Sequence, residues 1–391
     1  MERKVYLDSA ATTYVSSEVM AEMLPCFNAL YGNSNSVHSY GRDANAIVDR
    51  ARDRIAKAIN AAKSNEIYFT SGGTEADNWA IRGIAHAYAS KGKHIITSAI
   101  EHHAVLDACK SLEEEGYEVT YLPVDSTGLV SITDLIHSIK KETTLISIMA
   151  VNNEVGTIQN VKAIAKIAHD YGIIFHTDAV QALGAIKLDV QDMEIDAMTI
   201  SAHKVYGPKG AGCLYLKNGV KIENMFHGGS QERGKRGGTV NVPAVAGFGK
   251  AVEIAVRDMA INAQKIRAER EYFLKSVKEK IQYVHLNGHN HQKVASIVNL
   301  SFEMVDKESL LMLLDMEGIA VSAGSACTSN SVEESHVLKA MAIPAEIANG
   351  AIRFSFGKNI TKTDIDYVVE KLEKTVEKLR SISALTKAGR K

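Results

Sequence analysis

The chain has 391 residues, which is too long for one simple core and indicates about two domains. Its formal net charge of −1 gives no reason to expect nucleic acid or an anionic membrane surface as a partner. The apolar fraction of 46% and the charged fraction of 23% are typical of a soluble globular protein, and no run of about 18 uncharged apolar residues predicts a transmembrane helix.

The N-terminal residues Met1-Glu-Arg-Lys-Val-Tyr-Leu-Asp8 lack the long apolar region that a signal peptide needs. We therefore expect a cytoplasmic protein. Residues 5–8 are predicted to be a short extended segment. A helical pattern follows at residues 17–30, then a polar loop at 31–41 and a charged amphipathic helix at 44–60.

Strand and helix patterns alternate in the middle of the chain. Helices are predicted at residues 75–90 and 161–171. Strands are predicted at residues 66–70, 94–97, 117–122, 144–150, 173–176, 197–201 and 213–216. This alternation is typical of an α/β domain with a mostly parallel sheet.

The character of the sequence changes after Pro243. Residues 244–282 read as one long charged helix, residues 296–302 as a strand, and residues 364–382 as a closing amphipathic helix. We interpret this part as a second, smaller domain, with the long helix connecting the two.

Four cysteines lie far apart without any C-x-x-C pair, which disfavours a disulfide framework or a four-cysteine zinc site. Cys26 and Cys109 fall in helical patterns and Cys213 in an apolar strand, where a cysteine is usually a small buried hydrophobic residue. Cys327 differs because it stands in the small, polar, loop-like run 322–331. That setting permits exposure and reactivity.

One possible metal site involves three closely spaced histidines. His285, His289 and His291 could share a ligand sphere. The neighbouring Asn287-Gly288 signals a turn, and a solvated loop is the favoured interpretation.

Lys204 stands just after the predicted strand at 197–201, between Ser201-Ala-His203 and a glycine-rich turn. A lysine at the mouth of a strand, flanked by a hydroxyl and an imidazole, suits a Schiff base to an aldehyde cofactor. Taken alone, such a lysine is more often a plain surface residue.

Polar residues follow several other predicted strands, and ligands gather at this edge of α/β sheets. Ser71-Gly-Gly-Thr74 joins a strand to a helix and could bind a phosphate. His102 and His103 follow the next strand. Asn152-Asn-Glu-Val-Gly156 offers amide donors for a phenolate oxygen.

Asp178 ends another apolar strand, with Gln181 three residues later. A carboxylate there can stabilise a protonated pyridine nitrogen, which makes the ring an electron sink. Each cluster alone could be a cap or a turn. Together with Lys204, in this chain order, they predict pyridoxal 5'-phosphate as the cofactor.

Longer motifs connect these clusters to a known family. They are Tyr6-Leu-Asp-Ser-Ala-Ala-Thr-Thr13, Thr70-Ser-Gly-Gly-Thr-Glu-Ala-Asp-Asn78, Asn152-Asn-Glu-Val-Gly-Thr157, Ser201-Ala-His-Lys-Val-Tyr-Gly-Pro-Lys-Gly210, Gly228-Gly-Ser-Gln-Glu-Arg-Gly-Lys-Arg-Gly-Gly-Thr239 and Gly324-Ser-Ala-Cys-Thr-Ser329. Over nearly its whole length the chain resembles the NifS/IscS-type cysteine desulfurases, in the class V branch of fold-type I pyridoxal-phosphate enzymes.

The resemblance implies a fold as well as a chemistry. It implies a large α/β domain with a mixed, mostly parallel seven-stranded sheet, together with a smaller α+β domain. We place the large, cofactor-binding domain at residues 15–255. Residues 1–14 and 256–391 would form the small domain that carries the loop of Cys327.

The resemblance also implies roles for the residues at the strand ends. Lys204 would hold the cofactor as a Schiff base and, once freed by substrate, move the α-proton. Asp178 would pair with the pyridinium nitrogen. His102 would stack on the ring and serve in acid–base steps. Gln181 and Asn153 would contact the phenolate oxygen.

Further cofactor contacts are implied around the phosphate and the Schiff base. They are Gly73, Thr74, Ser201, Ala202 and His203, with Thr239 supplied by the other subunit of a homodimer. Arg353 would clamp the substrate carboxylate, for which guanidinium geometry is suited, and Asn153 would also contact the substrate.

Cys327 is implied to be the sulfur acceptor. It would attack the sulfur of cofactor-bound L-cysteine, giving L-alanine and a persulfide on the enzyme. The sulfur would pass to an acceptor protein, such as an iron–sulfur scaffold, for cluster assembly or for thiolation of transfer RNA. Cys327 could also serve as a transient iron–sulfur ligand. No direct binding of nucleic acid or membrane is expected.

Other functions stay open from the sequence. A selenocysteine lyase or a class V aminotransferase would use the same lysine and aspartate, although an aminotransferase would not need Cys327. A non-catalytic sulfur or iron–sulfur scaffold that kept the fold is a remote alternative. The presence of Lys204, Asp178, His102 and Arg353 with Cys327 argues against it.

Overall fold

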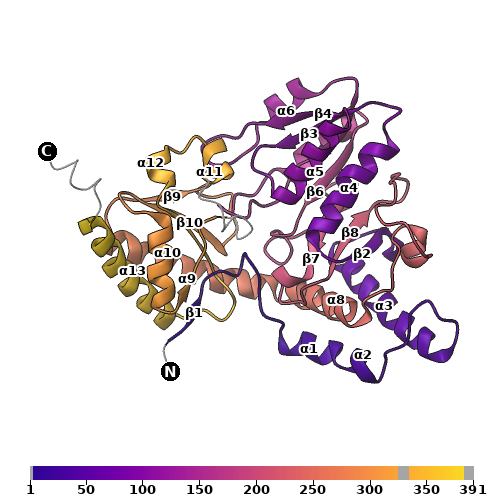
Figure 1. The fold of residues 1–391 in the computed structure, drawn as a ribbon, viewed down its shortest axis with the longest axis horizontal. Helices are drawn as coiled ribbons and strands as arrows, with labels where there is room; N and C mark the ends of the chain where they lie inside the picture. Colours follow the sequence, from indigo (N-terminus) through magenta and orange to yellow (C-terminus); the bar gives the residue numbers. More distant parts are fainter. Residues whose placement is uncertain (1–2, 325–333, 383–391) are drawn as a thin grey trace.

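The computed structural model describes residues 3–324 and 334–382. In Figure 1 a large sheet with its helices occupies the right side of the molecule, and a smaller group of strands and helices occupies the left. Among the described residues, no helix combines the length and the apolar character needed to cross a lipid bilayer.

The large sheet has seven strands. In spatial order they are β2 (Ile67–Thr70), β8 (Gly212–Leu216), β7 (Ala197–Ser201), β6 (Ile174–Asp178), β5 (Thr143–Ser147), β3 (His94–Ser98) and β4 (Glu118–Leu122). Strand β8 runs antiparallel to both of its neighbours, and the other pairs are parallel. The predicted mixed, mostly parallel seven-stranded sheet is therefore confirmed.

Helices cover both faces of this sheet. On one face lie α4 (Gly73–Ala87) and α5 (His103–Glu114), and on the other lie α3 (Ser39–Ala58), α7 (Val161–Asp170) and α8 (Val242–Arg257). Because successive strand residues point to opposite faces, Ile95 and Leu145 pack toward α4 and α5, whereas Ile96 and Ile146 pack toward the other layer. Burial on both faces explains why these strands are continuously apolar.

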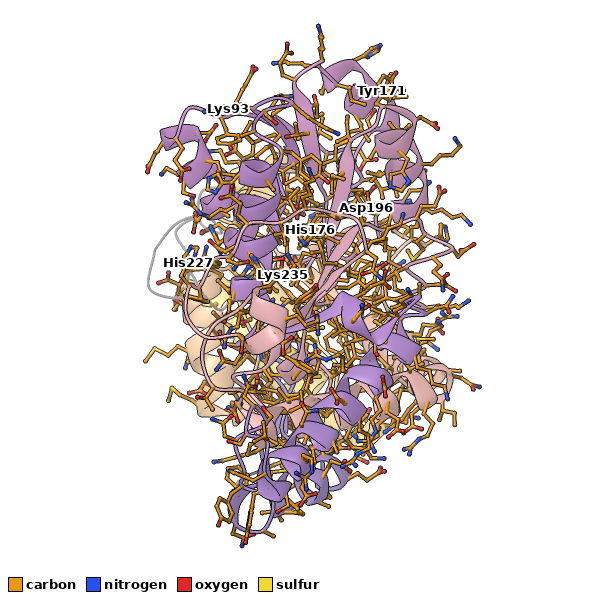
Figure 2. The ribbon with its side chains drawn as sticks, turned by 90° about the vertical axis from the view of Figure 1, so that its right-hand side faces the viewer. Lys93, Tyr171, His176, Asp196, His227 and Lys235 are labelled. Carbon is orange, nitrogen blue, oxygen red and sulfur yellow. The ribbon has the colours of Figure 1, made fainter. Side chains whose placement is uncertain are left out.

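Shorter elements surround this double-layered core. They are α1 (Ser17–Met23), α2 (Pro25–Asn28), α6 (Ile132–Ser138) and the 3₁₀ turns η1 (Ser64–Glu66), η2 (Ala202–Lys204) and η3 (Gln231–Gly234). Figure 2 labels His176 over the middle of the molecule, and this side chain is fully buried.

The smaller group has its own sheets and core. Strands β9 (Val284–Asn287), β10 (Ile297–Phe302) and β12 (Ala351–Ser355) form an antiparallel sheet, and β1 (Val5–Tyr6) pairs in parallel with β11 (Ile319–Ala320). Its helices are α9 (Met259–Lys280), α10 (Lys307–Met316), α11 (His336–Ala340), α12 (Ala345–Ala348) and α13 (Lys362–Ile382).

A separate hydrophobic cluster, with Phe273, Phe302 and Phe354 fully buried, holds the smaller group together. The N-terminal strand belongs to this cluster through Val5 and Leu7. The boundaries proposed from the sequence, residues 15–255 for the large domain and 1–14 with 256–391 for the small one, stay a prediction.

Several predicted helices differ in their bounds from the structure. The helix predicted at residues 17–30, for example, is divided into α1 and α2. The long helix expected at 244–282 is divided into α8 and α9 at Asp258, whose φ and ψ of −98° and 2° leave the α region. The division has a physical reason, because α8 packs in the core of the large sheet and α9 in the cluster of the small one. Helix α3 begins at Ser39, earlier than predicted, because His38 Nδ1 accepts a hydrogen bond from Gly41 N and caps it.

Candidate active site

One cavity lies at the carboxyl edge of the large sheet, where β2, β3, β5, β6 and β7 end. Its empty space is about 740 Å³. The lining residues are Ala10, Ala11, Gly73, Thr74, Asp77, His102, Met149, Asn153, Asp178, Val180, Gln181, Ser201, His203, Lys204 and Arg353. The structure therefore brings together nearly all of the site residues predicted from separate parts of the sequence.

Lys204 lies at the end of the short turn η2, directly after β7. Its Nζ donates hydrogen bonds to the carbonyl oxygens of Ala10 at 2.6 Å and Ala11 at 2.8 Å. The N-terminal segment is fixed beside it, since the Thr13 hydroxyl donates to the carbonyl of His203 at 2.9 Å. A primary amine is thus held at the edge of the cavity by main-chain oxygens.

Asp178 ends β6 with 6% of its surface exposed. Its Oδ1 accepts a hydrogen bond from Val180 N at 2.8 Å. Burial raises the pKa of Asp178, whereas the Val180 amide and the nearby charges of His102 and Lys204 act to lower it. A carboxylate surrounded by these groups can face a cationic ring nitrogen from the base of the cavity.

Two further predicted residues flank this carboxylate. His102 is the N-cap of α5, and its Nδ1 accepts from Ala104 N at 3.1 Å, which fixes the orientation of the ring. Gln181 Nε2 donates to the same Ala10 carbonyl that binds Lys204, at 2.9 Å. Both side chains are therefore anchored by the backbone at the cavity wall.

A site for an anion lies at the other end of the cavity. Gly73 and Thr74 begin the 15-residue helix α4, whose N-terminus favours negative charge. A Cβ atom on Gly73 would lie 2.9 Å from Val180 Cγ2, so the close approach needs glycine. Ser201 Oγ is buried and has no hydrogen-bond partner among the described residues.

His203 completes this end of the cavity. Its Nδ1 lies 3.1 Å from Thr12 Oγ1. Burial lowers the pKa of His203 to about 4, and the charges of Lys204 and Lys209 add to the effect. The imidazole is therefore neutral near pH 7, and it serves as a hydrogen-bonding group rather than a charge.

Arg353, from the middle of β12, is 1% exposed although it is charged. Its Nη1 donates to the carbonyl of Asn153 at 2.9 Å, and its Nη2 forms an ion pair with Asp8 Oδ1 at 3.0 Å. Its Nε has no hydrogen-bond partner among the described residues. A buried guanidinium with an unused donor, in a cavity wall, suits a carboxylate.

The donor set fits a cofactor that carries an aldehyde, a pyridine nitrogen and a phosphate. Lys204 supplies the amine and Asp178 the carboxylate. The unpaired Ser201 hydroxyl and the start of α4 supply donors for the phosphate. Pyridoxal 5'-phosphate has these three groups.

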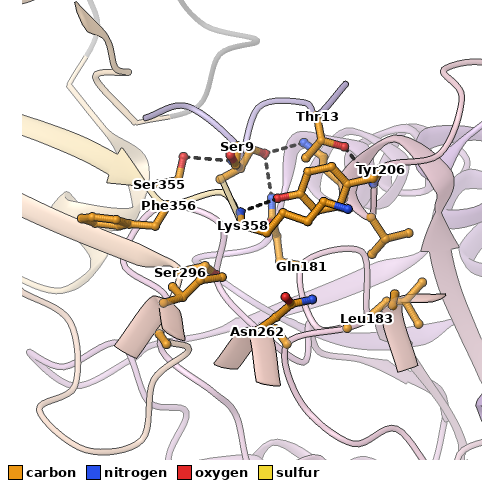
Figure 3. Close-up of a pocket in the computed structure, with 18 of the residues that line it drawn as sticks. Ser9, Thr13, Gln181, Leu183, Tyr206, Asn262, Ser296, Ser355, Phe356 and Lys358 are labelled. Carbon is orange, nitrogen blue, oxygen red and sulfur yellow. Dashed lines mark hydrogen bonds between the residues drawn. The ribbon is translucent and has the colours of Figure 1, made fainter. Parts of the chain in front are cut away.

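A second cavity lies between the large and the small sheet (Figure 3). It shares Ala10, Val180, Gln181 and Lys204 with the first cavity. Among the described residues its lining is mostly apolar and includes no carboxylate. Lys204 therefore borders both cavities, whereas the carboxyl groups of the candidate site line only the first.

Three predicted residues are not placed in the cavity. Ala202 is fully buried behind it, where its N–H donates to the carbonyl of Ala211 at 3.1 Å. Thr239 is exposed and does not line the cavity of its own chain. Its contribution from a partner subunit stays a prediction. Cys327 lies outside the described residues.

The described residues on either side of the segment that carries Cys327 approach one side chain, the buried Glu154. Ser335 Oγ donates to Glu154 Oε2 at 2.6 Å. A Cβ atom on Gly324 would lie 2.9 Å from the same oxygen. Since Glu154 follows Asn153, both ends of the segment lie beside the loop that lines the cavity.

Sequence reasoning missed several cavity residues, of which Asp77 is the most polar. Because α4 begins at Gly73, Asp77 lies four residues later on the same face of this helix. The helix predicted from the sequence begins only at residue 75, so this relation was not apparent. Ala10 and Ala11 belong to the motif at residues 6–13, but nothing in the chemistry of alanine predicted that their carbonyls bind Lys204.

Three further cysteines, and His285 from the histidine group considered as a metal site, take structural positions. Cys26, Cys109 and Cys213 are buried free thiols, as predicted. His285 pairs with Glu303. In the part of the chain that the structure describes, no group of three or more His, Cys, Asp or Glu side chains is placed to hold a metal ion.

Comparisons with known proteins agree with this geometry. The family model Aminotransferase class-V matches residues 5–368. Cysteine desulfurase IscS of Dictyoglomus turgidum is 50% identical over 383 residues, which cover 98% of this chain and 97% of that protein. A solved NifS-like protein has a TM-score of 0.91 at 37% identity, with 96% of this chain and 100% of that chain covered.

One further solved structure bears on the substrate. It is SspA in complex with cysteine, with a TM-score of 0.80 at 35% identity. The match covers 90% of this chain and 98% of that chain. That protein therefore has a similar fold and binds cysteine.

The carboxyl of Glu101, beside His102, is a sensitive group behind the cavity. It is fully buried and accepts hydrogen bonds from Ser98 Oγ at 2.5 Å and from Met149 N at 3.0 Å. Burial raises the pKa of Glu101 to about 8, although the hydrogen bonds from Ser98 and Met149 act to lower it.

We predict that this group makes stability depend on pH. Between about pH 4.5 and 8 the folded state keeps a proton that the unfolded state releases, so the free energy of unfolding falls as the pH rises. Replacing the group, as in Glu101→Gln, should remove this dependence. The free energy of unfolding of the variant, relative to that of the wild type, should then increase by about 3–5 kcal/mol as the pH rises through this range.

Urea unfolding at the two ends of the window measures this difference. The exposed Glu114→Gln serves as a matched control and should differ from the wild type equally at both pH values. The prediction would be contradicted if Glu101→Gln and the wild type differed in unfolding free energy by the same amount at both pH values.

Proposed function

The chain belongs to the class-V aminotransferase family of pyridoxal-phosphate-dependent enzymes, and we propose that it is a cysteine desulfurase that converts L-cysteine to L-alanine. The observation that carries the proposal is the placement of Lys204, Asp178 and Arg353 around one cavity. It stands in a chain that matches a protein named Cysteine desulfurase IscS over 98% of its length.

Lys204 and Asp178 account for the first step. Pyridoxal phosphate, bound to Lys204 through its aldehyde, supplies an electron sink for the electrons released from the substrate. Lys204 Nζ, once released by the substrate amine, takes the proton from Cα. The Ala10 and Ala11 carbonyls position this amine, and Asp178, in the same cavity wall, is assigned to the ring nitrogen of the cofactor.

Arg353 binds and orients the substrate. Its unpaired Nε and the remaining N–H groups of its guanidinium can receive the substrate carboxylate, while Asp8 and the Asn153 carbonyl hold the side chain in place. His102, fixed as the cap of α5, lines the same cavity and is assigned to acid–base steps. Gly73, Thr74, Ser201 and His203 are assigned to the phosphate.

Cys327 is assigned to the sulfur step. Its thiolate attacks the sulfur of bound L-cysteine, so that a sulfur–sulfur bond forms and the bond between that sulfur and Cβ breaks. The electron pair passes to the substrate carbon, which takes up a proton and leaves as alanine. The enzyme keeps the sulfur as a persulfide, which is an electrophile that an acceptor thiol can attack.

The later fate of the sulfur is also part of the proposal. We assign it to an acceptor protein that serves iron–sulfur assembly or thiolation of transfer RNA. A cytoplasmic homodimer, in which Thr239 of each chain reaches the other site, completes the proposal. A transient iron–sulfur ligand role of Cys327 stays a prediction.

The direct test measures alanine and sulfide released from L-cysteine, with and without dithiothreitol. We expect a yellow protein that forms alanine and, with dithiothreitol, an equal amount of sulfide. Cys327→Ala should stay yellow and be inactive, because only the sulfur acceptor is lost. The matched control Cys26→Ala removes a buried thiol and should keep activity.

Each alternative has its own result in this test. Turnover of L-cysteine by Cys327→Ala would show that Cys327 does not accept the sulfur. Activity on selenocysteine alone, or on an amino-acid and keto-acid pair alone, would replace the proposed function.

A second prediction concerns substrate binding by Arg353. Arg353→Lys should raise KM for L-cysteine about 10- to 100-fold with a smaller effect on kcat, because a charge-assisted hydrogen bond contributes about 1.5–3 kcal/mol. Steady-state kinetics of the yellow protein measure both constants. Arg82, on α4, forms an ion pair with Glu115. Arg82→Lys is therefore a matched control and should leave KM unchanged. An unchanged KM in Arg353→Lys would contradict the assignment.

A further inference from the structure

A second carboxyl group lies in the cofactor cavity besides Asp178. Asp77, on α4, lines the cavity and is 1% exposed. Its Oδ1 has no hydrogen-bond partner among the described residues. Buried polar atoms in native proteins are almost always paired, so an unpaired carboxyl oxygen in a cofactor cavity needs a functional reason.

A chain of side chains fixes Asp77 from behind. The Thr199 hydroxyl bonds to the Asp77 carboxyl and lies 3.1 Å from His176 Nε2. His176 Nδ1 lies 2.9 Å from Ser147 Oγ. His176 Nε2 is also 3.8 Å from Asp77 Oδ1. His176 and Thr199 are fully buried on neighbouring strands, and Figure 2 labels His176 over the middle of the molecule.

The charges around Asp77 differ from those around Asp178. Burial raises the pKa of Asp77 well above its usual range, and the negative charge of Asp178 raises it further. The cationic groups of His102 and Lys204 act on Asp178 and stabilise its ionised form. Two ionised carboxylates buried in the wall of one cavity are costly, so the pair keeps one proton.

His176 cannot take this proton. Burial lowers the pKa of His176 to about 3, so the imidazole is neutral. The hydrogen-bonded side chains of Ser147, His176 and Thr199 are therefore all uncharged. The proton is held by the pair of carboxyl groups, Asp77 and Asp178.

We propose that Asp77 is a positioning residue of the cofactor site, which holds the proton of the carboxyl pair so that Asp178 alone meets the cofactor's ring nitrogen as a carboxylate. This inference rests on the proposed function. With its proton, Asp77 donates to Thr199, Thr199 donates to His176 Nε2, and the His176 Nδ1–H donates to Ser147. Each member of the chain then has one consistent direction of hydrogen bonding.

The test compares the affinity of apoprotein variants for pyridoxal phosphate, followed by visible absorbance as a function of pH. Asp77→Asn replaces a neutral acid with a neutral amide of the same shape, so its affinity should stay within about twofold of the wild type, with the same pH profile. Asp77→Leu should lose about tenfold, because the buried Thr199 hydroxyl loses its partner at the base of the cavity.

A second variant covers the case in which Asp77→Leu does not fold. Thr199→Val keeps the shape of the side chain and removes only the hydroxyl that joins Asp77 to His176. It should also lower the affinity several-fold. Far-UV circular dichroism and the thermal midpoint of each apoprotein identify variants that fold.

Three outcomes decide the proposal. A loss of tenfold or more in Asp77→Asn, with a shifted pH profile, would mean that Asp77 acts as a charge and would overturn it. Wild-type affinity in both Asp77→Leu and Thr199→Val would overturn it as well. Wild-type apoprotein that does not take up pyridoxal phosphate would instead overturn the proposed function.

Discussion

The candidate site depends on the parallel alignment of strands in the large sheet. Because β3, β5, β6 and β7 run in the same direction, their carboxyl ends meet at one edge. Residues that are far apart in the sequence, such as His102, Asp178 and Lys204, therefore line one cavity. A change of direction in any of these strands would move one of these groups to the opposite edge and dismantle the chemistry.

A second dependence links the large sheet to the small one. The N-terminal segment contacts both sides of the cavity, since Asp8 pairs with Arg353 of β12 and the Ala10 carbonyl binds Lys204 and Gln181. The guanidinium that we propose to bind the substrate thus comes from the small sheet, and the amine that we propose to react comes from the large one. Hydrogen bonds of residues 8–11 join these two groups directly, together with the bond from Arg353 to the Asn153 carbonyl.

The sequence predicted the α/β architecture because its strands are short apolar runs buried on both faces, and it predicted most of the site because polar residues at strand ends converge in such sheets. It could not predict the break at Asp258, which depends on two cores that α8 and α9 separately join. The sequence also could not predict that the Ala10 and Ala11 carbonyls bind Lys204, because every residue has a main-chain carbonyl. The properties of Asp77 depend on its burial. Sequence periodicity predicts the burial of a carboxylate poorly, so the role of Asp77 could not be predicted.

The most direct test of the central claim is peptide mass spectrometry of the yellow protein after a single turnover with L-cysteine. The account predicts that the peptide containing Cys327 gains the mass of one sulfur atom, that dithiothreitol removes it, and that the buried Cys26, Cys109 and Cys213 stay unmodified. Formation of alanine with the added sulfur on another cysteine, or on none, would contradict it.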